Sequence, residues 1–223
     1  TSQLWHGLSK HLYNSSTYKH NSGGNPENII DLTHDYLVEF HKKHYHPSNA
    51  TFFTFGNVDP TEIQDFINEN VLKSFQPSSE TIVVKNENRI TQPKTITEYY
   101  NPMPEDENNH HVVLSWLLGE SHNPVELLES YLVSNILLDN SASPLRKTLE
   151  NTDLGKSLSP LTGLEADHKE LVFAAGLEGV DSNKQLEVEE LIINCLKNVV
   201  SNGISKELVQ SSLHQLEIKQ REI

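Results

Sequence analysis

Cysteine is almost absent from this sequence: Cys195 is the single thiol among 223 residues. One thiol excludes an internal disulfide and every zinc site that is built on several cysteines. Cys195 lies between Ile192 and Leu196 in an apolar stretch, where we expect it to act as a small buried side chain. Cysteine usage therefore does not indicate the compartment in which the protein works.

Basic residues are scarce relative to acidic ones. The chain has 17 Lys and Arg against 31 Asp and Glu, which gives a formal net charge of −14. A surface with this balance repels phosphate backbones and anionic lipids, so we expect neither nucleic acid nor a membrane as a partner. An acidic surface also favours solubility, so the charge alone does not identify a cationic partner.

Long hydrophobic runs are also missing. The best run, residues 112–119, has the length of a strand and is far shorter than the roughly 18 residues needed to span a bilayer. The chain starts with Thr1, shows no signal-peptide pattern, and ends without a glycine or proline stop signal. We therefore expect a section of a longer, soluble protein. The sequence leaves its compartment unknown, and the bacterial cytoplasm or an organelle matrix is favoured.

The first half of the chain carries two strong helix patterns. Thr33 can cap a helix that Pro47 ends, and Asp59 followed by Pro60 can start a second helix. Residues 50–56 between them are rich in Phe and Thr, which predicts a strand. We expect these three elements to pack together as the last part of a unit that covers residues 1–75.

Polar, proline-containing sequence follows this unit. We interpret residues 76–108 as a connector that contains short strands at 81–84 and 95–100.

The second unit is predicted to cover residues 109–223. It reads as a strand at 110–119, a helix capped by Asn123, a short helix near 143–151, two strands around a polar hinge at 166–170, and two amphipathic helices. Gly203 ends the first of these last two helices and Ser205 begins the second. The predicted inward faces are Leu127, Leu128, Tyr131 and Leu132 on one helix, and Val188, Leu191, Ile192, Cys195 and Val199 on another. This order predicts an α+β fold, with an antiparallel sheet and helices packed on one face.

Three histidines within six residues, His41, His44 and His46, suggest a metal site. A catalytic zinc needs three protein ligands and an open position, and two histidines on a helix leave the third ligand to come from elsewhere. His41 and His44 also fall on the apolar stripe of Leu37 and Phe40, in the last helical turn, where a donor or cation satisfies free carbonyls. We therefore interpret these histidines as packing residues.

Other motifs with catalytic chemistry are missing from the sequence. None of the twelve histidines belongs to a His-Glu-x-x-His or His-x-x-Glu-His motif, and there is no Gly-x-Ser-x-Gly elbow. Residues 22–27 (SGGNPE) lack the Lys-Ser/Thr pair of a phosphate-binding loop, which favours a turn. The acidic stretch at residues 103–109 (MPEDENN) lacks the spacing of a calcium loop. We predict no catalytic, cofactor-binding or metal-binding residue in this chain.

Two stretches of the sequence resemble one peptidase family. Residues 22–60 contain Ser-Gly-Gly with Pro26 and the run Tyr-His-Pro-Ser-Asn-Ala at 45–50. Residues 143–155, followed by Ser-Pro-Leu-Thr-Gly and Phe-Ala-Ala-Gly-Leu-Glu-Gly-Val, form the second stretch. Both resemble the pitrilysin/insulinase zinc metallopeptidases, most closely the presequence-protease branch, and they occur in the order expected for that branch.

The resemblance implies a clamshell-shaped peptidase that encloses and degrades unfolded peptides. In that family an inverted His-x-x-Glu-His motif and a later glutamate bind zinc, and these residues precede the region that this chain resembles. The expected chain is therefore an inactive section of an enzyme: the end of the first domain (1–75), the connector (76–108), and most of the second domain (109–223). It would form part of the chamber wall, position peptide and contact the rest of the same polypeptide, while the parent holds zinc.

Two other functions stay open from the sequence. The chain could be an independent scaffold or peptide-binding protein, similar to the inactive partner subunits of that family. A histidine-rich metal-storage module is a third possibility, although the remaining histidines are dispersed. An isolated section would expose surfaces that are normally covered, so self-association through them is also expected.

Overall fold

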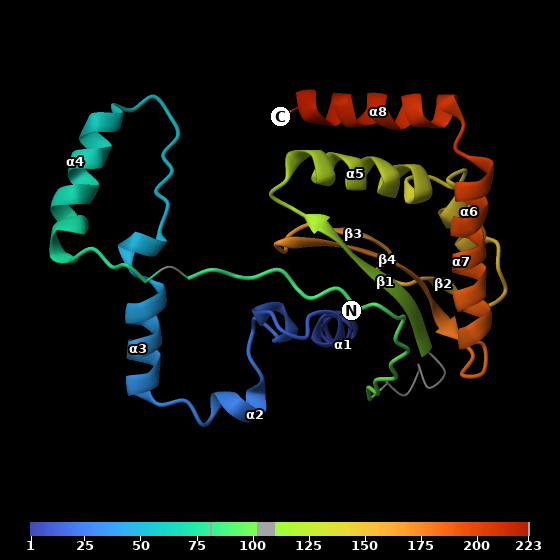
Figure 1. The fold of residues 1–223 in the computed structure, drawn as a ribbon, viewed down its shortest axis with the longest axis horizontal. Helices are drawn as coiled ribbons and strands as arrows, with labels where there is room; N and C mark the ends of the chain where they lie inside the picture. Colours follow the sequence, from blue (N-terminus) through green and yellow to red (C-terminus); the bar gives the residue numbers. More distant parts are fainter. Residues whose placement is uncertain (81, 102–109, 223) are drawn as a thin grey trace. The chain divides into compact units, whose positions relative to one another are not determined.

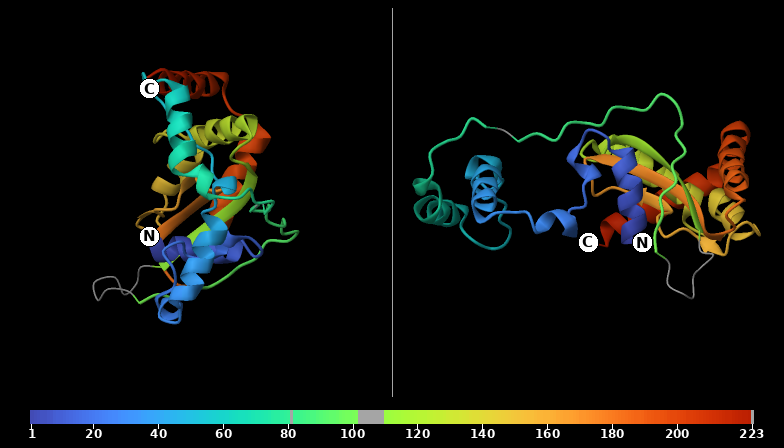
Figure 2. Two further views of the ribbon diagram at one scale, coloured as in Figure 1. Left: turned by 90° about the vertical axis from the view of Figure 1, so that its left-hand side faces the viewer. Right: turned by 90° about the horizontal axis from the view of Figure 1, so that it is seen from below.

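The computed structural model describes residues 1–80, 82–101 and 110–222. The chain forms two compact units, shown in Figures 1 and 2. We call Asn21–Lys85 the helical unit. The other, the sheet unit, combines Thr1–His20 with Asn86–Ile223. The first twenty residues therefore pack with the second half of the chain, although the sequence patterns group them with residues 21–75.

The helical unit contains the two predicted helices. Its elements are α2 (Pro26–Ile29), α3 (His34–His44), the short 3-10 helix η2 (Pro47–Asn49), α4 (Pro60–Asn70) and η3 (Leu72–Ser74). The expected caps of α3 and α4 are confirmed: the Thr33 hydroxyl accepts from the Tyr36 amide at 3.2 Å, and the Asp59 carboxylate accepts from the Thr61 amide at 2.7 Å.

The strand predicted at residues 50–56 is wrong, because this stretch has no strand pairing. The described residues at 82–84 and 95–100 also form no strand, contrary to the prediction for the connector. A strand gains its hydrogen bonds from a neighbour, and Phe-rich sequence alone does not supply one. The side chains of Phe53 and Phe55 are accordingly 85% and 94% exposed.

The sheet unit is built around a long central strand, β4 (Glu170–Val180). Strand β1 (His110–Glu120) pairs antiparallel with one edge of β4. The short strands β2 (Ser157–Leu158) and β3 (Gly163–Glu165) pair antiparallel with its other edge. The predicted hinge between two strands is confirmed, although the first of them is divided into β2 and β3.

Helices cover one face of this sheet and enclose the core. They are α5 (Pro124–Leu138), α6 (Pro144–Glu150) and α7 (Gln185–Asn202), with α8 (Lys206–Arg221) packed on α5. Phe173, Ala175 and Leu177 of β4 meet Leu145 and Ile192 of these helices in one buried cluster. Alternate residues of β1, such as Trp116 opposite Phe173, pack against the same cluster. The predicted α+β fold is confirmed.

The inward face of α7 is predicted well, and that of α5 is not. Val188, Ile192 and Cys195 are buried as expected. In α5 the buried residues are instead Ser134, Ile136 and Leu137, whereas Leu128 and Tyr131 are 54% and 40% exposed. Apolar side chains surround most of α5, so its sequence does not specify which side faces the core.

An additional helix begins the chain. Helix α1 (Ser2–Leu12) and the 3-10 helix η1 (Thr17–Lys19) lie on the side of the sheet opposite α5 (Figures 1 and 2). Together with residues 86–89 they bring polar side chains against the start of β4. In the described part of the chain, no helix combines the length and the apolar character that a membrane crossing requires.

Candidate functional site

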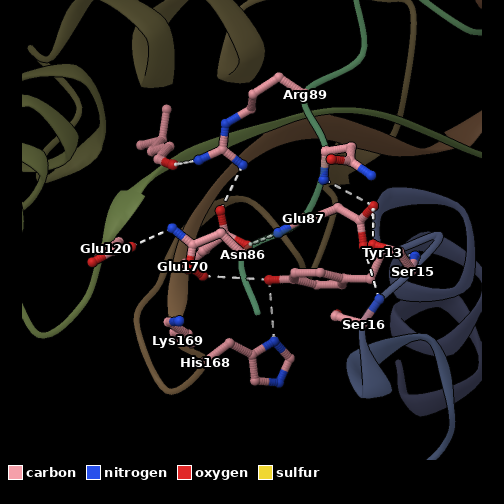
Figure 3. Close-up of polar contacts among 12 residues, drawn as sticks. Tyr13, Ser15, Ser16, Asn86, Glu87, Arg89, Glu120, His168, Lys169 and Glu170 are labelled. Carbon is pink, nitrogen blue, oxygen red and sulfur yellow. Dashed lines mark hydrogen bonds and ion pairs between the residues drawn. The ribbon is translucent and has the colours of Figure 1, made fainter. Parts of the chain in front are cut away.

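The carboxylate of Glu87 is buried and surrounded by donors. Its side chain accepts hydrogen bonds from the Ser15 amide at 2.8 Å, the Ser15 hydroxyl at 2.9 Å and the Ser16 amide at 3.0 Å. The Asn88 amide donates to it as well, at 3.1 Å. Residues that are 71 and 72 positions apart are thereby joined at one carboxylate, as Figure 3 shows.

A second buried carboxylate, Glu170 at the start of β4, lies beside the first. It accepts the backbone amide of Glu87 at 2.7 Å. Its other oxygen forms an ion pair with an Arg89 guanidinium nitrogen at 2.7 Å, although this contact lacks good hydrogen-bond alignment. Arg89 also donates to the backbone carbonyl of Leu118 in β1. The connector is thus attached to both long strands of the sheet.

Aromatic residues also contact the chain at Glu170 and its neighbour Lys169. The Tyr13 hydroxyl donates to the Glu170 carbonyl at 3.3 Å and lies 3.4 Å from His168 Nδ1 (Figure 3). The Tyr18 hydroxyl accepts from the Lys169 amide at 3.0 Å, and its ring stacks on His168 with centroids 4.3 Å apart. We call Tyr13, Ser15, Ser16, Glu87, Arg89 and Glu170 the carboxylate cluster.

The pKa values of Glu87 and Tyr13 are both shifted further from neutral pH. Burial raises the pKa of Glu87, but the hydrogen bonds from Ser15 and Ser16 outweigh it, so the pKa lies below its usual value of 4.5. Burial, followed by the negative charge of Glu170, raises the pKa of the Tyr13 phenol. Near neutral pH the carboxylate therefore stays ionised and the phenol stays protonated, which suits a structural role better than proton transfer.

The histidines of α3 do not converge. His41 stacks on Tyr45 with ring centroids 4.8 Å apart, whereas His44 stacks on Phe40 at 4.1 Å. His46 uses Nδ1 to accept the Ser48 amide at 3.1 Å. Of the two apolar residues on the predicted stripe, only Phe40 stacks on one of these histidines. Leu37 and Phe40 are 61% and 44% exposed, so the stripe does not face a core in this unit.

Among the described residues, the surroundings of these histidines offer a cavity but no group of metal ligands. A cavity of about 410 Å³ is lined by His41, Lys42, Tyr45, His46 and Phe75. Across residues 1–80, 82–101 and 110–222, no three His, Cys, Asp or Glu side chains gather in a way that could hold a metal ion. The residues described here therefore do not fit the zinc site of the family, and we derive no catalytic step through zinc.

The glycine-containing stretch at residues 22–27 forms a turn that leads into helix α2. Residues 22 and 23 form the predicted turn, and Asn25 caps α2 by accepting the Glu27 amide at 3.2 Å. The acidic stretch at residues 103–109 lies outside the described part of the chain.

The carboxylate cluster itself is not predicted from the sequence. Glu87 and Glu170 are isolated acidic residues that match no motif. The one available signal is the apolar spacing of Leu4, Trp5 and Leu8, which indicates an amphipathic helix that must pack somewhere.

The fold and the cluster together define an α+β domain in which polar groups hold distant segments of the chain. The description "Peptidase M16 inactive domain" matches residues 31–216. The chain belongs to the M16 peptidase family, which confirms the predicted resemblance to the pitrilysin/insulinase peptidases.

Similar proteins point to the same branch. The chain is 34% identical to "Presequence protease, mitochondrial" of Xenopus tropicalis, over 96% of this chain and 22% of that protein. It is 30% identical to "Protein HypA" of Clostridium perfringens, over 98% of this chain and 22% of the relative. The chain thus spans about a fifth of the length of these relatives.

Solved structures share its fold. The peptidase M16 inactive domain from Pseudomonas fluorescens matches with a TM-score of 0.73 and 17% identity, over 97% of this chain and 50% of that one. An M16-like peptidase from Alicyclobacillus acidocaldarius matches with a TM-score of 0.60 and 19% identity, over 99% and 51%.

Proposed function

We propose that this chain is a non-catalytic section of a zinc-dependent peptidase that degrades unfolded peptides. In this role it contributes to the wall of the peptide chamber and helps to position the substrate. The observation that carries the proposal is the match of residues 31–216 to an inactive peptidase domain. The presequence proteases among its relatives support peptides as the substrate class.

The rest of the same polypeptide is the proposed partner. We assign residues 1–75 to the end of the first peptidase domain, 76–108 to the connector and 109–223 to most of the second domain. The exposure of apolar side chains in the helical unit supports this assignment, because Phe53 and Phe55 would be costly to leave in water. The relatives contain about five times as much sequence, which could supply the cover and the zinc ligands.

Strand β1 is the proposed place for positioning peptide. It is eleven residues long and lies at the end of the sheet, where an extended peptide can add main-chain hydrogen bonds. Among the described residues, Arg89 and Glu126 bind main-chain groups near its C-terminal end, at Leu118 and Glu120. A peptide bound beside the middle of β1 would be recognised mainly through its backbone, which suits a peptidase with varied substrates.

A comparison of the parent protein with this chain tests the proposal. We expect the parent to cleave an unstructured fluorogenic peptide and to lose this activity with a zinc chelator. The chain alone should bind the same peptide without cleaving it, even with added zinc. Cleavage by the chain alone would refute its non-catalytic role. Peptide binding with no peptidase activity in the parent would instead favour an independent peptide-binding protein.

A further inference from the structure

We propose that the carboxylate cluster is a hinge anchor, which fixes both ends of the helical unit to one place on the sheet unit. The chain leaves the sheet unit at His20 and returns to it at Asn86. Ser15 and Ser16 lie just before the departure point, and Glu87 lies just after the return point. Because these residues are hydrogen-bonded to each other, the two connections start from a single base.

Residues at the start of the central strand hold the anchor in place on the sheet unit. Glu170 belongs to the central strand and is 1% exposed, and it accepts the Glu87 amide directly. Tyr18, the next anchored residue along the outgoing chain, accepts the Lys169 amide beside it. Hydrogen bonds to buried charged groups are about twice as strong as neutral ones and are directional, so they fix the position of the backbone as well as its proximity.

The connections that extend from this base are short. On the returning side, the Ile82 amide donates to Asn49 of the helical unit at 3.4 Å, and Asn86 already contacts Glu120 of the sheet unit. Only residues 83–85 lie between these two contacts. On the outgoing side, Tyr18 is held by Lys169, just before β4, and α2 begins at Pro26. Two short connections from one base restrict the motion of the helical unit far more than one connection would.

Opening of this anchor exposes polar groups, and water can replace their hydrogen-bond partners. The Ser15 and Ser16 amides, which Glu87 binds, can be solvated by water when the contact opens. Glu98, on the same connector, supplies a natural comparison, because it is an exposed carboxylate paired with Lys10 at 3.2 Å. Its loss should leave the base of the two connections unchanged.

Hydrogen exchange and a distance measurement on the whole chain test the inference. In Glu87→Ala we expect the Ser15 and Ser16 amides to exchange about 10- to 100-fold faster, which corresponds to losing a hydrogen bond to a charged group. Spin labels at Glu62→Cys in α4 and Glu190→Cys in α7, in a Cys195→Ala background, report the distance between the units. Their distance distribution should become wider in Glu87→Ala and stay unchanged in Glu98→Ala.

The isosteric variant Glu87→Gln keeps the test decisive if the alanine variant fails to fold. It retains one acceptor oxygen, so an intermediate gain in exchange and in distribution width is expected. Amides of β4 must stay protected in every variant, which separates local opening from unfolding. Faster exchange at Ser15 and Ser16 with an unchanged distance distribution would overturn the hinge role, as would equal widening in Glu98→Ala.

Discussion

The backbone amide of Glu87 donates a hydrogen bond to the Glu170 carboxylate at 2.7 Å, although the residues are 83 positions apart. Two acidic residues can lie this close because the contact joins an amide to a carboxylate. The Glu87 carboxylate is directed toward Ser15 and Ser16, and Arg89 balances the charge of Glu170. Buried charges of one sign are tolerated when each has its own donors.

Replacing Glu170 with alanine should destabilise the sheet unit by about 2–3 kcal/mol. The variant leaves the buried Glu87 amide without its acceptor and Arg89 without its counter-charge. The cost stays moderate because Arg89 is about half exposed and water can solvate it. Urea unfolding measures the change, with the exposed Glu190→Ala in α7 as the matched control.

Equal stability of the Glu170 and Glu190 variants would show that the carboxylate cluster contributes nothing to the free energy of unfolding.

Acid should weaken the protein partly through Glu87. Its pKa in the folded state is lowered, so the stability it contributes is present above its usual value of 4.5 and is lost as the pH falls through the folded pKa. Glu87→Gln removes this titration. We therefore expect the difference in unfolding free energy between wild type and variant to shrink as the pH falls below 4.5.

Urea unfolding at a series of pH values between neutral and acid measures this difference. A difference that stays constant with pH would contradict the lowered pKa of Glu87.

The sequence predicts individual elements of this fold better than their partners. The caps at Thr33, Asp59 and Asn123 act over two or three residues, so local sequence specifies them. The carboxylate cluster joins residues 13–16, 87–89 and Glu170, and no local pattern encodes contacts over such separations. The strand predicted at 50–56 fails for the same reason, because strand formation depends on a neighbour.

Two glycines should respond in opposite ways to alanine. A Cβ at Gly176 of β4 would clash with the Val112 carbonyl and approach the Val113 Cα to 2.8 Å, both in the paired strand β1. A Cβ at Gly7 of α1 would make ordinary contacts, with Glu98 carbons at 3.7 and 3.9 Å. We expect Gly176→Ala to cost about 1–3 kcal/mol and Gly7→Ala to add about 0.5–1 kcal/mol.

Thermal unfolding of both variants provides the comparison. A loss of stability in Gly7→Ala would mean that α1 packs more tightly than its contacts indicate.

The exposed phenylalanines of the helical unit should contribute little to the stability of the chain by itself. Because Phe53 and Phe55 are 85% and 94% exposed, the double serine variant removes almost no buried surface. We expect a change in unfolding free energy within about 0.5 kcal/mol, whereas Ile192→Ala in the buried core should cost about 2–5 kcal/mol. Urea unfolding of the two variants compares these positions.

The same serine variant in the full-length parent distinguishes an intrinsic surface from a covered one. If other parts of the polypeptide bury these side chains, the parent should lose about 1.5–3 kcal/mol for each phenylalanine. Glu62→Ser on the exposed side of α4 is the control, since it should be neutral in both proteins. A parent as tolerant of the double variant as the isolated chain would show that this apolar surface stays uncovered, and the assignment of residues 1–75 to a larger peptidase domain would then fail.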